Sequence, residues 1–435
     1  IQCKAASTRE SRVKHHWVRG NLPLCSKCQV CGEDCNVRPE LSDLRCCWCR
    51  RTVHDDCAAR LDVCDLGRYR RLIVPPNCVE LTWVGLKGTR QRHLVVKKVR
   101  HPDIEHWTPL IVIGNRKSGN NDGELLLRHF RAILNTPQVI DVHDISPENG
   151  LEWCHLLPDV TFRVLVCGGD GTIGWVLNAI ENLGLKNSPR VCILPLGTGN
   201  DLSRVLGWGE GYAGDVEVTD ILDNVLKAKP VNLDRWTVKI RHTKHFGFAR
   251  PGREVVMNNY ASLGVDALVT LNFHKQRENW PTLFANRIIN KLTYFTYGTK
   301  DVLERECKNL HLKLKVELDG RLIQLPEIEG LVILNISSWG GGCRPWELGK
   351  EDGDHFLPAR YDDGLLEVMA LYSSFHIAQL QVGLAAPLRL GQASKVKIKL
   401  IGGNAPMQVD GEPWEQHPGE IIITSRGQAA VMALE

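Results

Sequence analysis

The middle of the chain is organised around three short apolar runs, each of which ends in a cluster of glycines. The runs are Leu110–Ile113, Arg163–Cys167 and Val191–Leu194, and the clusters lie within residues 114–119, 168–172 and 197–201. Each pair has the pattern of a strand, a tight turn and the start of a helix. Three such units in succession predict a parallel sheet with helices on its faces. Ligands bind such sheets beyond the carboxyl ends of the strands, so all three clusters are expected at one ligand-binding edge.

After about residue 232 the pattern changes to strand-like segments that are separated by turn signals. These segments predict a mostly antiparallel β-sandwich lobe, with Leu283–Tyr297 as a helix packed against it. We therefore expect a multidomain chain with five parts: 1–14 as the remnant of an upstream segment, 15–64 as a small cysteine-rich α+β module, 65–106 as a linker, 107–231 as a three-layer α/β lobe, and 232–435 as the β lobe.

The bulk composition excludes several classes of protein. Hydrophobic residues make up 43% of the chain and charged residues 24%, which is typical of globular proteins rather than disordered ones. The 54 basic and 50 acidic residues are too evenly balanced to favour nucleic acid as a partner. We find neither an apolar run of membrane-spanning length nor a signal peptide. The first residue is Ile1, which suggests a fragment or a processed product.

Cysteine and histidine are concentrated near the amino end. The spacing contains two C-x2-C pairs and one H-x2-C pair, and it supplies eight candidate zinc ligands: His15, Cys28, Cys31, Cys46, Cys49, His54, Cys57 and Cys64. Eight ligands are enough for two tetrahedral sites, which a module with so small a core needs in order to fold. His16 could replace His15, and Cys25, Cys35 and Cys47 are further thiols close by. Thiols used in this way indicate a reducing, cytoplasmic compartment.

The glycine clusters suit a phosphate ligand, because backbone N–H groups and a helix N-terminus can approach it closely. The cluster at 114–119 is not a P-loop, since Asn120 and Asn121 follow where Lys and Ser or Thr would be needed. A dinucleotide motif is present at Gly169, Gly171 and Gly174. The acidic residue that such a site needs after the next strand is absent, so hydride transfer is disfavoured.

Taken together and in order, the motifs resemble the diacylglycerol kinase family over nearly the whole chain. Sphingosine kinases and NAD kinases share the architecture but not this full set of motifs. The resemblance implies that ATP contacts the following residues: Asn115, Ser118, Gly119, Gly168, Gly169, Gly171, Thr172, Gly197, Thr198, Gly199, Asn200 and Asp201. Further motifs at 257–267, 339–342, 362–365 and 408–412 resemble the accessory half of these kinases, and 15–28 with 335–346 is closest to the epsilon type.

The cysteine-rich module resembles the phorbol-ester-type zinc domain of protein kinase C and diacylglycerol kinases. In that family the ligands interleave, which implies one zinc ion held by His15, Cys46, Cys49 and Cys64 and another held by Cys28, Cys31, His54 and Cys57. Members that bind lipid carry a Gln-Gly pair where this chain has residues 42–45. A packing role or protein contacts are therefore at least as expected for this module as lipid binding.

The resemblance implies a two-lobed lipid kinase that uses ATP and Mg²⁺ to phosphorylate the free hydroxyl of diacylglycerol at a membrane surface. The product would be phosphatidate, in lipid second-messenger signalling and the phosphatidylinositol cycle. Asp410, with Glu412 beside it, would take the hydroxyl proton, and Asp170 would act near the phosphates through Mg²⁺ or water. Asp362 and Asp363 would support a magnesium site, and Lys117 could neutralise a phosphate. Two alternatives stay open: a kinase for sphingoid or monoacyl lipids, and a membrane-recruited adaptor with an inactive kinase lobe.

Overall fold

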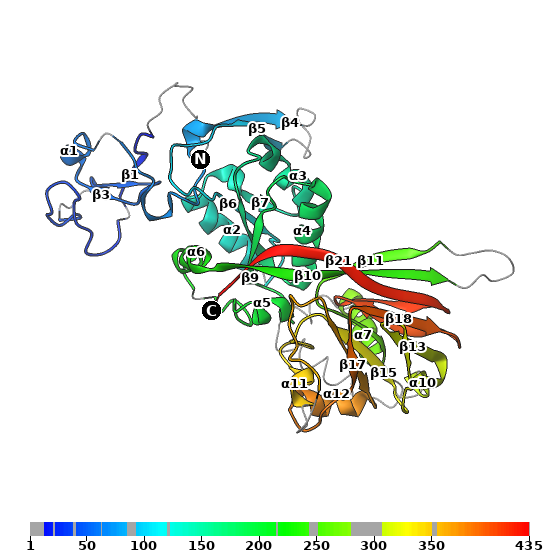
Figure 1. The fold of residues 1–435 in the computed structure, drawn as a ribbon. Coiled ribbons are helices and arrows are strands. Elements are labelled where there is room, and N and C mark those ends of the chain that lie inside the picture. Colours follow the sequence, from blue (N-terminus) through cyan, green and yellow to red (C-terminus); the bar gives the residue numbers. More distant parts are fainter. Residues whose placement is uncertain are drawn as a thin grey trace.

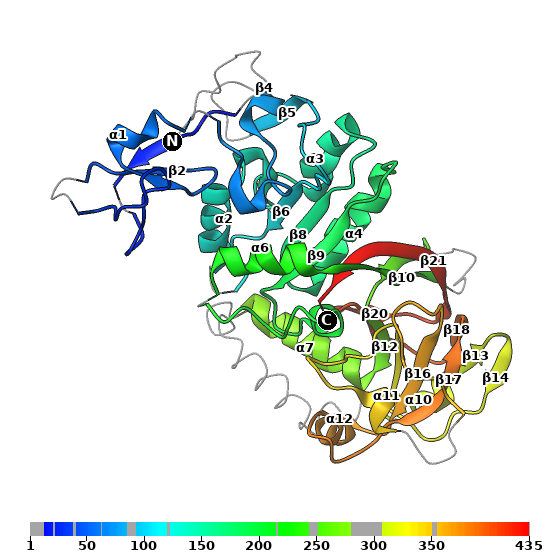
Figure 2. The same cartoon turned by 60° about the vertical axis from the view of Figure 1, so that its left-hand side comes forward.

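The computed structural model describes residues 13–20, 22–37, 41–61, 63–84, 93–119, 122–214, 216–242, 251–279, 307–349 and 355–434. The expected upstream remnant up to residue 12 and the expected helix Leu283–Tyr297 lie outside the described residues. Two lobes share one large sheet, and the cysteine-rich module sits at the far end of the first lobe (Figures 1 and 2). Among the described residues, no helix combines the length and apolar character that crossing a bilayer would require.

The first lobe is built on a parallel sheet in the strand order β9-β8-β6-β7. The strands are β6 (Leu110–Gly114), β7 (Val139–Asp141), β8 (Arg163–Gly168) and β9 (Arg190–Pro195). β6 pairs in parallel with both β7 and β8, and β8 pairs in parallel with β9. All three strands that precede the glycine clusters therefore end at the same edge, where the sequence places the ligand.

Helices cover both faces of this sheet because alternate strand residues point to opposite sides. On one face, Val112 and Leu165 pack with the apolar residues of α2 (Asp122–Ile133) and α6 (Val218–Lys227). On the other face, Ile111 and Val164 pack with those of α3 (Pro147–Leu151), α4 (Asp170–Leu183) and the short α5 (Asp201–Val205). The 3-10 turns of this lobe are η3 (Thr136–Gln138) and η4 (Glu152–Leu156).

The last strand of the chain joins the two lobes. β21 (Gly419–Ala433) pairs along its whole length with β10 (Lys229–His242), with a register shift between Arg235 and Trp236. The first half of β21 also pairs with β18, whereas Val431 near its end pairs in parallel with Val191 of β9. The parallel sheet thus continues through β21 into antiparallel strands: β18 (Lys395–Leu400), β13 (Leu314–Leu318) and β14 (Arg321–Ile323), with β11 (Arg253–Met257) beside β10.

A second, antiparallel sheet of six strands faces the antiparallel half of the first. Its order is β17 (Leu388–Ala393), β16 (Leu366–Leu371), β15 (Gly330–Leu334), β12 (Tyr260–Gly264), β19 (Ala405–Val409) and β20 (Glu412–Gln416). One apolar core, which includes Trp236 and Ile398 from the first sheet and Ile333 from the second, fills the space between the sheets. The other face of the second sheet is covered by α7 (Val265–Asn279) and α12 (Ser374–Gln381), with α10 (Leu310–Lys313) and α11 (Pro345–Leu348) at its margins.

The cysteine-rich module and the segment after it pack onto the first lobe. The module contains β1 (Trp17–Arg19), β2 (Leu44–Cys46), β3 (Thr52–Val53) and α1 (Asp55–Ala58). Cys46 and Cys64 share a core with α2, and the Arg50 guanidinium donates to the backbone oxygen of Ala132 at 2.7 Å. The following segment has η1 (Gly67–Tyr69), η2 (Pro76–Cys78) and the hairpin β4 (Val79–Val84) and β5 (His93–Val99).

Part of the expected linker, residues 65–106, belongs to the core of the first lobe. Leu72 and Ile73 are fully buried in the core of the first lobe, and the Val74 N–H donates to the Gln138 side chain at 2.8 Å. The β4–β5 hairpin exposes Lys97 and Lys98 but also packs on the first lobe through the buried Val99, so the expected linker is folded against this lobe.

Candidate active site

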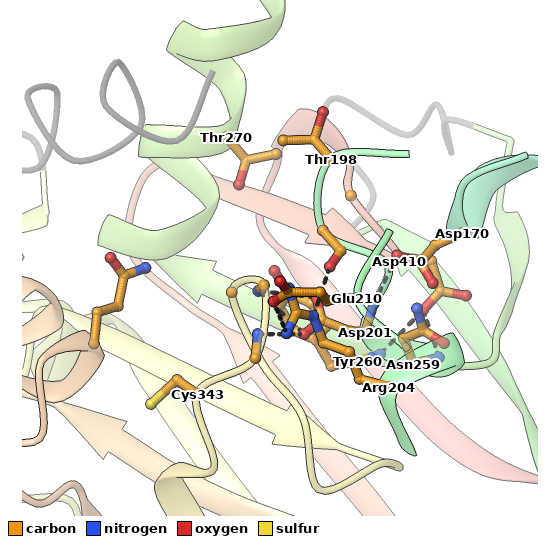
Figure 3. Close-up of a pocket in the computed structure, with 16 residues that line it drawn as sticks. Asp170, Thr198, Asp201, Arg204, Glu210, Asn259, Tyr260, Thr270, Cys343 and Asp410 are labelled. Atoms are coloured by element: carbon orange, nitrogen blue, oxygen red, sulfur yellow. Dashed lines mark hydrogen bonds and ion pairs between the residues drawn. The ribbon is translucent and has the colours of Figure 1, made fainter. Parts of the chain in front are cut away.

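A cavity of about 550 Å³ lies where the glycine-rich edge of the first lobe meets the second lobe (Figure 3). The first lobe contributes Asp170, Thr198, Gly199, Asp201, Arg204 and Glu210. The second lobe contributes Asn259, Tyr260, Thr270, Gly340, Gly341, Gly342, Cys343, Gln381, Asp410 and Gly411. The site is therefore formed by both lobes, and four acidic residues line it: Asp170, Asp201, Glu210 and Asp410.

Asp170 begins α4 and lies against the start of α5. Its two carboxylate oxygens accept the N–H groups of Asp201 and Leu202, both at 3.2 Å. Desolvation in the cavity raises the pKa of Asp170 to about 6, and the neighbouring charge of Asp201 adds to the rise. Two neighbouring carboxylates that repel each other are an arrangement that a divalent cation would relieve, because oxygen ligands are what Mg²⁺ prefers.

Asp201 links the two lobes. Its carboxylate accepts N–H groups from Gly341 and Gly342, each at 3.1 Å, and the hydroxyl of Ser338. Burial raises the pKa of Asp201, and these donors together with Arg204 oppose the rise. The glycine loop 340–342 is therefore held against the glycine-rich edge of the first lobe and forms a wall of the cavity.

Asp410 lies in the turn of the β19–β20 hairpin. Its φ of 48° and that of Gly411, 83°, are the left-handed values of a two-residue Asp-Gly hairpin turn. One carboxylate oxygen accepts the backbone N–H and the side-chain amide of Asn258, and the other accepts the N–H groups of Asn259 and Tyr260. Burial raises the pKa of Asp410 although these donors favour the charged form. The carboxylate is thus rigidly oriented in the cavity.

The hairpin turn also decides the position of Glu412. The sequence left open whether Asp410 and Glu412 share a strand face or flank a turn, and the structure has the turn. Glu412 begins β20 on the exposed surface and does not line the cavity. It is therefore not brought together with Asp410.

The second and third glycine clusters touch each other at the cavity. A Cβ atom on Gly169 would lie 3.0 Å from the Cα of Gly197, and one on Gly197 would lie 2.6 Å from the Cα of Gly169. Only glycine allows the two turns to approach in this way. Asn200 holds the third cluster, because its side-chain amide donates to the backbone oxygens of Gly197 and Glu210. A Cβ on Gly171, in contrast, would meet nothing within 4 Å.

The remaining expected nucleotide residues lie at the same edge but outside the cavity lining. Asn115 accepts the Lys117 N–H with its side chain, and the backbone oxygen of Ser118 accepts from Gly123, so residues 115–119 form a tight turn after β6. This turn does not line the cavity, and neither do Gly168, Gly169, Gly171, Thr172, Gly197 and Asn200. The structure does not bring the Lys117 side chain to the cavity either.

Asp362 and Asp363 lie elsewhere. Asp362 forms an ion pair with Arg360 at 2.9 Å, and Asp363 accepts the N–H of Leu365 in a tight turn at 3.0 Å. Neither residue lines the cavity, and among the described residues neither belongs to a group of three potential metal ligands. Their arrangement is that of turn-forming side chains.

Sequence reasoning did not single out several residues of the cavity. Arg204, Glu210, Thr270 and Gln381 carry no motif signal, since only the fold brings their elements to the cavity. Asn259 and Tyr260 lie inside the 257–267 motif, which the sequence placed in the accessory half without a role for either residue. Their backbone N–H groups bind Asp410.

The cysteine-rich module contains two groups of four potential metal ligands. One is His15, Cys46, Cys49 and Cys64, and the other is Cys28, Cys31, His54 and Cys57. Each group pairs a histidine Nδ1 with a cysteine Sγ at 3.4 Å, His15 with Cys49 and His54 with Cys31. The ligand atoms within each group lie within 4.8 Å of one another. The donor sets fit tetrahedral zinc, and His15 rather than His16 is the histidine in the first group.

The fold and the site define the class of the protein as a two-lobed kinase. The diacylglycerol kinase catalytic domain model matches residues 109–234, and the diacylglycerol kinase accessory domain model matches residues 256–413. Diacylglycerol kinase 2 from Arabidopsis thaliana is 33% identical over 99% of this chain and 75% of its own length. The chain belongs to the diacylglycerol kinase family.

Further relatives and solved structures are similar over different shares of their length. Diacylglycerol kinase theta from Homo sapiens is 42% identical over 80% of this chain but only 38% of its own length. Probable diacylglycerol kinase 3 from Caenorhabditis elegans is 34% identical over 98% of this chain and 57% of its own length. A putative diacylglycerol kinase from Bacillus anthracis str. Sterne, known as a crystal structure, is 17% identical with a TM-score of 0.49, over 75% of this chain and 97% of that one.

Proposed function

We propose that this chain transfers the γ-phosphoryl group of ATP to the free hydroxyl of diacylglycerol and so makes phosphatidate at a membrane surface. The observation that carries the proposal is the cavity between the lobes, where a glycine-rich edge and the acids Asp170, Asp201 and Asp410 converge. Phosphoryl transfer depends mainly on positioning and on neutralising charge, and a cavity of this composition supplies both.

The nucleotide would bind along the glycine-rich edge of the first lobe. The N-terminus of α4, which begins at Asp170 directly after the second glycine cluster, lies at this edge, and a helix N-terminus favours the charge of phosphate. We assign the adenosine triphosphate to this edge and to the turns at 115–119 and 197–201. Mg²⁺ would be held by Asp170 with Asp201 behind it, and would neutralise charge on the phosphates when bound. Asp362 and Asp363 are not assigned to this magnesium ion, because neither residue lines the cavity.

The proton of the acceptor hydroxyl would pass to Asp410. This carboxylate lines the same cavity as Asp170 and Asp201, and desolvation raises its pKa toward the range of a useful general base. Its four N–H contacts hold it in one orientation, which positions a base but also moderates its basicity. An alternative role follows from the same contacts, in which Asp410 only anchors the turn 258–260 and forms the wall of the acceptor site.

We also propose a role for each part of the chain. Residues 15–64 would form a module with two structural zinc ions that packs on the kinase. Residues 107–231 would form the nucleotide lobe and residues 232–435 the accessory lobe. The end of β21 returns from the accessory lobe to pair with the first lobe. The thiol-rich module suits the reducing cytoplasm, and the lipid acceptor implies peripheral contact with a membrane. Resemblance to the epsilon type stays a prediction.

The test is incorporation of labelled γ-phosphate into lipid from ATP and Mg²⁺ with diacylglycerol in mixed micelles. We expect labelled phosphatidate from the wild type and none from Gly169→Asp, because a carboxylate there would crowd Gly197 and repel phosphate. Sphingosine and monoacylglycerol serve as competing acceptors in the same assay. Bound ATP without labelling of any of these lipids would contradict the proposal and favour the inactive adaptor.

A further inference from the structure

The segment around α12 has exposed apolar side chains and contains no formally charged residue. Residues 371–388 contain no Asp, Glu, Lys or Arg, although a stretch of this length would carry about four at the chain's average of 24%. Tyr372, Phe375, Val382 and Leu384 are nevertheless exposed, with relative accessibilities of 48%, 59%, 60% and 78%. We call these four residues the α12 apolar surface. Large apolar side chains gathered on a surface without charges mark a contact site.

The inner face of α12 is packed, so the exposed residues are not a consequence of a loose helix. Ile377 and Leu380 belong to the core beneath the second sheet, and the Ser373 hydroxyl caps the helix by accepting the N–H of His376. His376 in turn bonds the backbone at Tyr372 and Ala386, so both ends of the segment are fixed. Figures 1 and 2 show α12 at the end of the second lobe that is remote from the parallel sheet.

The α12 apolar surface is continuous with the wall of the active-site cavity. Gln381, the last residue of α12, lines the cavity, and Gly340 approaches it closely enough that a Cβ would lie 3.2 Å from the Gln381 amide nitrogen. The Cys343 thiol, which also lines the cavity, donates to the backbone oxygen of Leu380 at 3.4 Å. The surface therefore adjoins the cavity wall, since Val382 directly follows Gln381 in the chain.

We propose that the α12 apolar surface is the face by which this kinase rests on a lipid bilayer. The inference deepens the proposed function and rests on it, because a lipid acceptor must reach the cavity from a membrane. The cavity of about 550 Å³ is shared with a nucleotide, so the acyl chains stay in the bilayer while the hydroxyl enters. Exposed aromatic and aliphatic side chains insert into the region between headgroups and acyl chains. The absence of charges on the segment favours apolar insertion over attraction to anionic headgroups.

The test measures sedimentation with neutral phosphatidylcholine vesicles that contain diacylglycerol, without nucleotide. The variant Val382→Glu/Leu384→Glu places two charges in the surface. The control Leu156→Glu/Leu322→Glu places two charges at exposed leucines of η4 and β14, away from α12. We expect the variant to bind vesicles at least about tenfold more weakly than the wild type and the control to bind as the wild type does. Wild-type binding should not fall between low and high salt, since no headgroup attraction is involved.

Activity gives a second, independent readout. With monomeric short-chain diacylglycerol and no vesicles, the variant should stay within about twofold of the wild type, because Val382 and Leu384 do not line the cavity. This result also shows that the variant is folded. Vesicle binding by the variant equal to that of the wild type would overturn the inference. So would a wild type that stays in the supernatant, the outcome expected if a soluble protein covers this surface. Vesicle binding that depends on α12 in an enzyme that phosphorylates no lipid would support the docking face and refute the proposed function.

Discussion

Arg235 and Asp410 are joined through a single side chain, that of Asn258. The Asn258 oxygen accepts from the Arg235 Nε at 3.0 Å, and its amide nitrogen donates to Asp410 at 3.2 Å. The buried Arg235 guanidinium also pairs with Glu181 of α4, the helix that begins at Asp170. A path of hydrogen bonds and one ion pair therefore connects Asp410 in the second lobe with the C-terminal part of α4 in the first lobe.

Replacement of Asn258 by Ala should break this path. The change leaves one donor of a buried arginine unpaired, which costs about 1–3 kcal/mol of unfolding free energy. It also removes one of the donors that lower the pKa of Asp410, so that pKa should rise further. Denaturant unfolding measures the first effect, with Asn404→Ala as a surface control that should change stability by less than about 0.5 kcal/mol. Equal stability of Asn258→Ala and wild type would contradict the path.

The two glycines Gly169 and Gly171 should respond differently to the same substitution. Gly169→Ala places a Cβ 3.0 Å from the Gly197 backbone, whereas Gly171→Ala meets open space. We expect Gly169→Ala to lower kcat/KM by about tenfold or more through displaced phosphate contacts, and Gly171→Ala to stay near wild type. Steady-state kinetics at varied ATP separate the two, and similar losses at both positions would show that the close approach of the clusters is unimportant.

Asp410→Asn should lower kcat by about 10²–10⁴-fold, the range expected for loss of a general base, while ATP affinity changes little. The amide nitrogen cannot accept from the backbone N–H groups that contact Asp410, so the melting temperature should also fall. The matched control is Glu412→Gln two residues away, which is exposed and should keep its activity. Loss of ATP binding in Asp410→Asn, or an equal loss of kcat in Glu412→Gln, would contradict the role of Asp410.

Activity should depend on pH through Asp170. Its pKa is raised to about 6 from 3.8, so the ionised form that a metal needs is lost as the pH falls through about 6, and activity should fall with it. Because the pKa of Asp170 is higher in the folded protein than in the unfolded chain, ionisation of Asp170 lowers the free energy of unfolding as the pH rises through about 6. Asp201→Asn removes the neighbouring charge, which should lower the pKa of Asp170 and move the acidic limb of the pH–rate profile to lower pH. An acidic limb that does not move would show that the two carboxylates are not coupled.

The cysteine-rich module should bind two zinc ions per chain. Cys31→Ser removes one ligand from one group and should leave about one zinc ion, whereas Cys25→Ser, outside both groups, should leave two. Elemental analysis of purified protein gives the count. A strong chelator should lower the melting temperature of the wild type, since Cys46 and Cys64 share a core with α2. Equal zinc content in the two variants would contradict the ligand assignment.

The local signals in the sequence were enough to predict the parallel sheet, the common edge of the glycine clusters and the two groups of potential metal ligands. Each depends on residues close together in the chain: an apolar strand, the glycine turn that follows it, or a cysteine pair on one tight turn. The strand endings at Gly114, Gly168 and Pro195 lie at one edge because the strand–turn–helix pattern repeats without interruption. Local periodicity and turn chemistry carry such information directly.

Other features were decided only when distant segments packed together. Whether Glu412 joins Asp410 depended on a hairpin turn, and the sequence pattern was compatible with either arrangement. The return of β21 to the first lobe, where Val431 pairs with Val191, has no sequence signal, because strand pairing over such separations is set by the whole core. The same is true of Asp201 binding Gly341 across the lobes.

The sequence by itself determined which strands end in glycine turns and which cysteines and histidines group as potential metal ligands, because both depend on neighbours in the chain. The tertiary structure alone decided which of the acids face one cavity, since burial and neighbouring charges act through space and not along the chain.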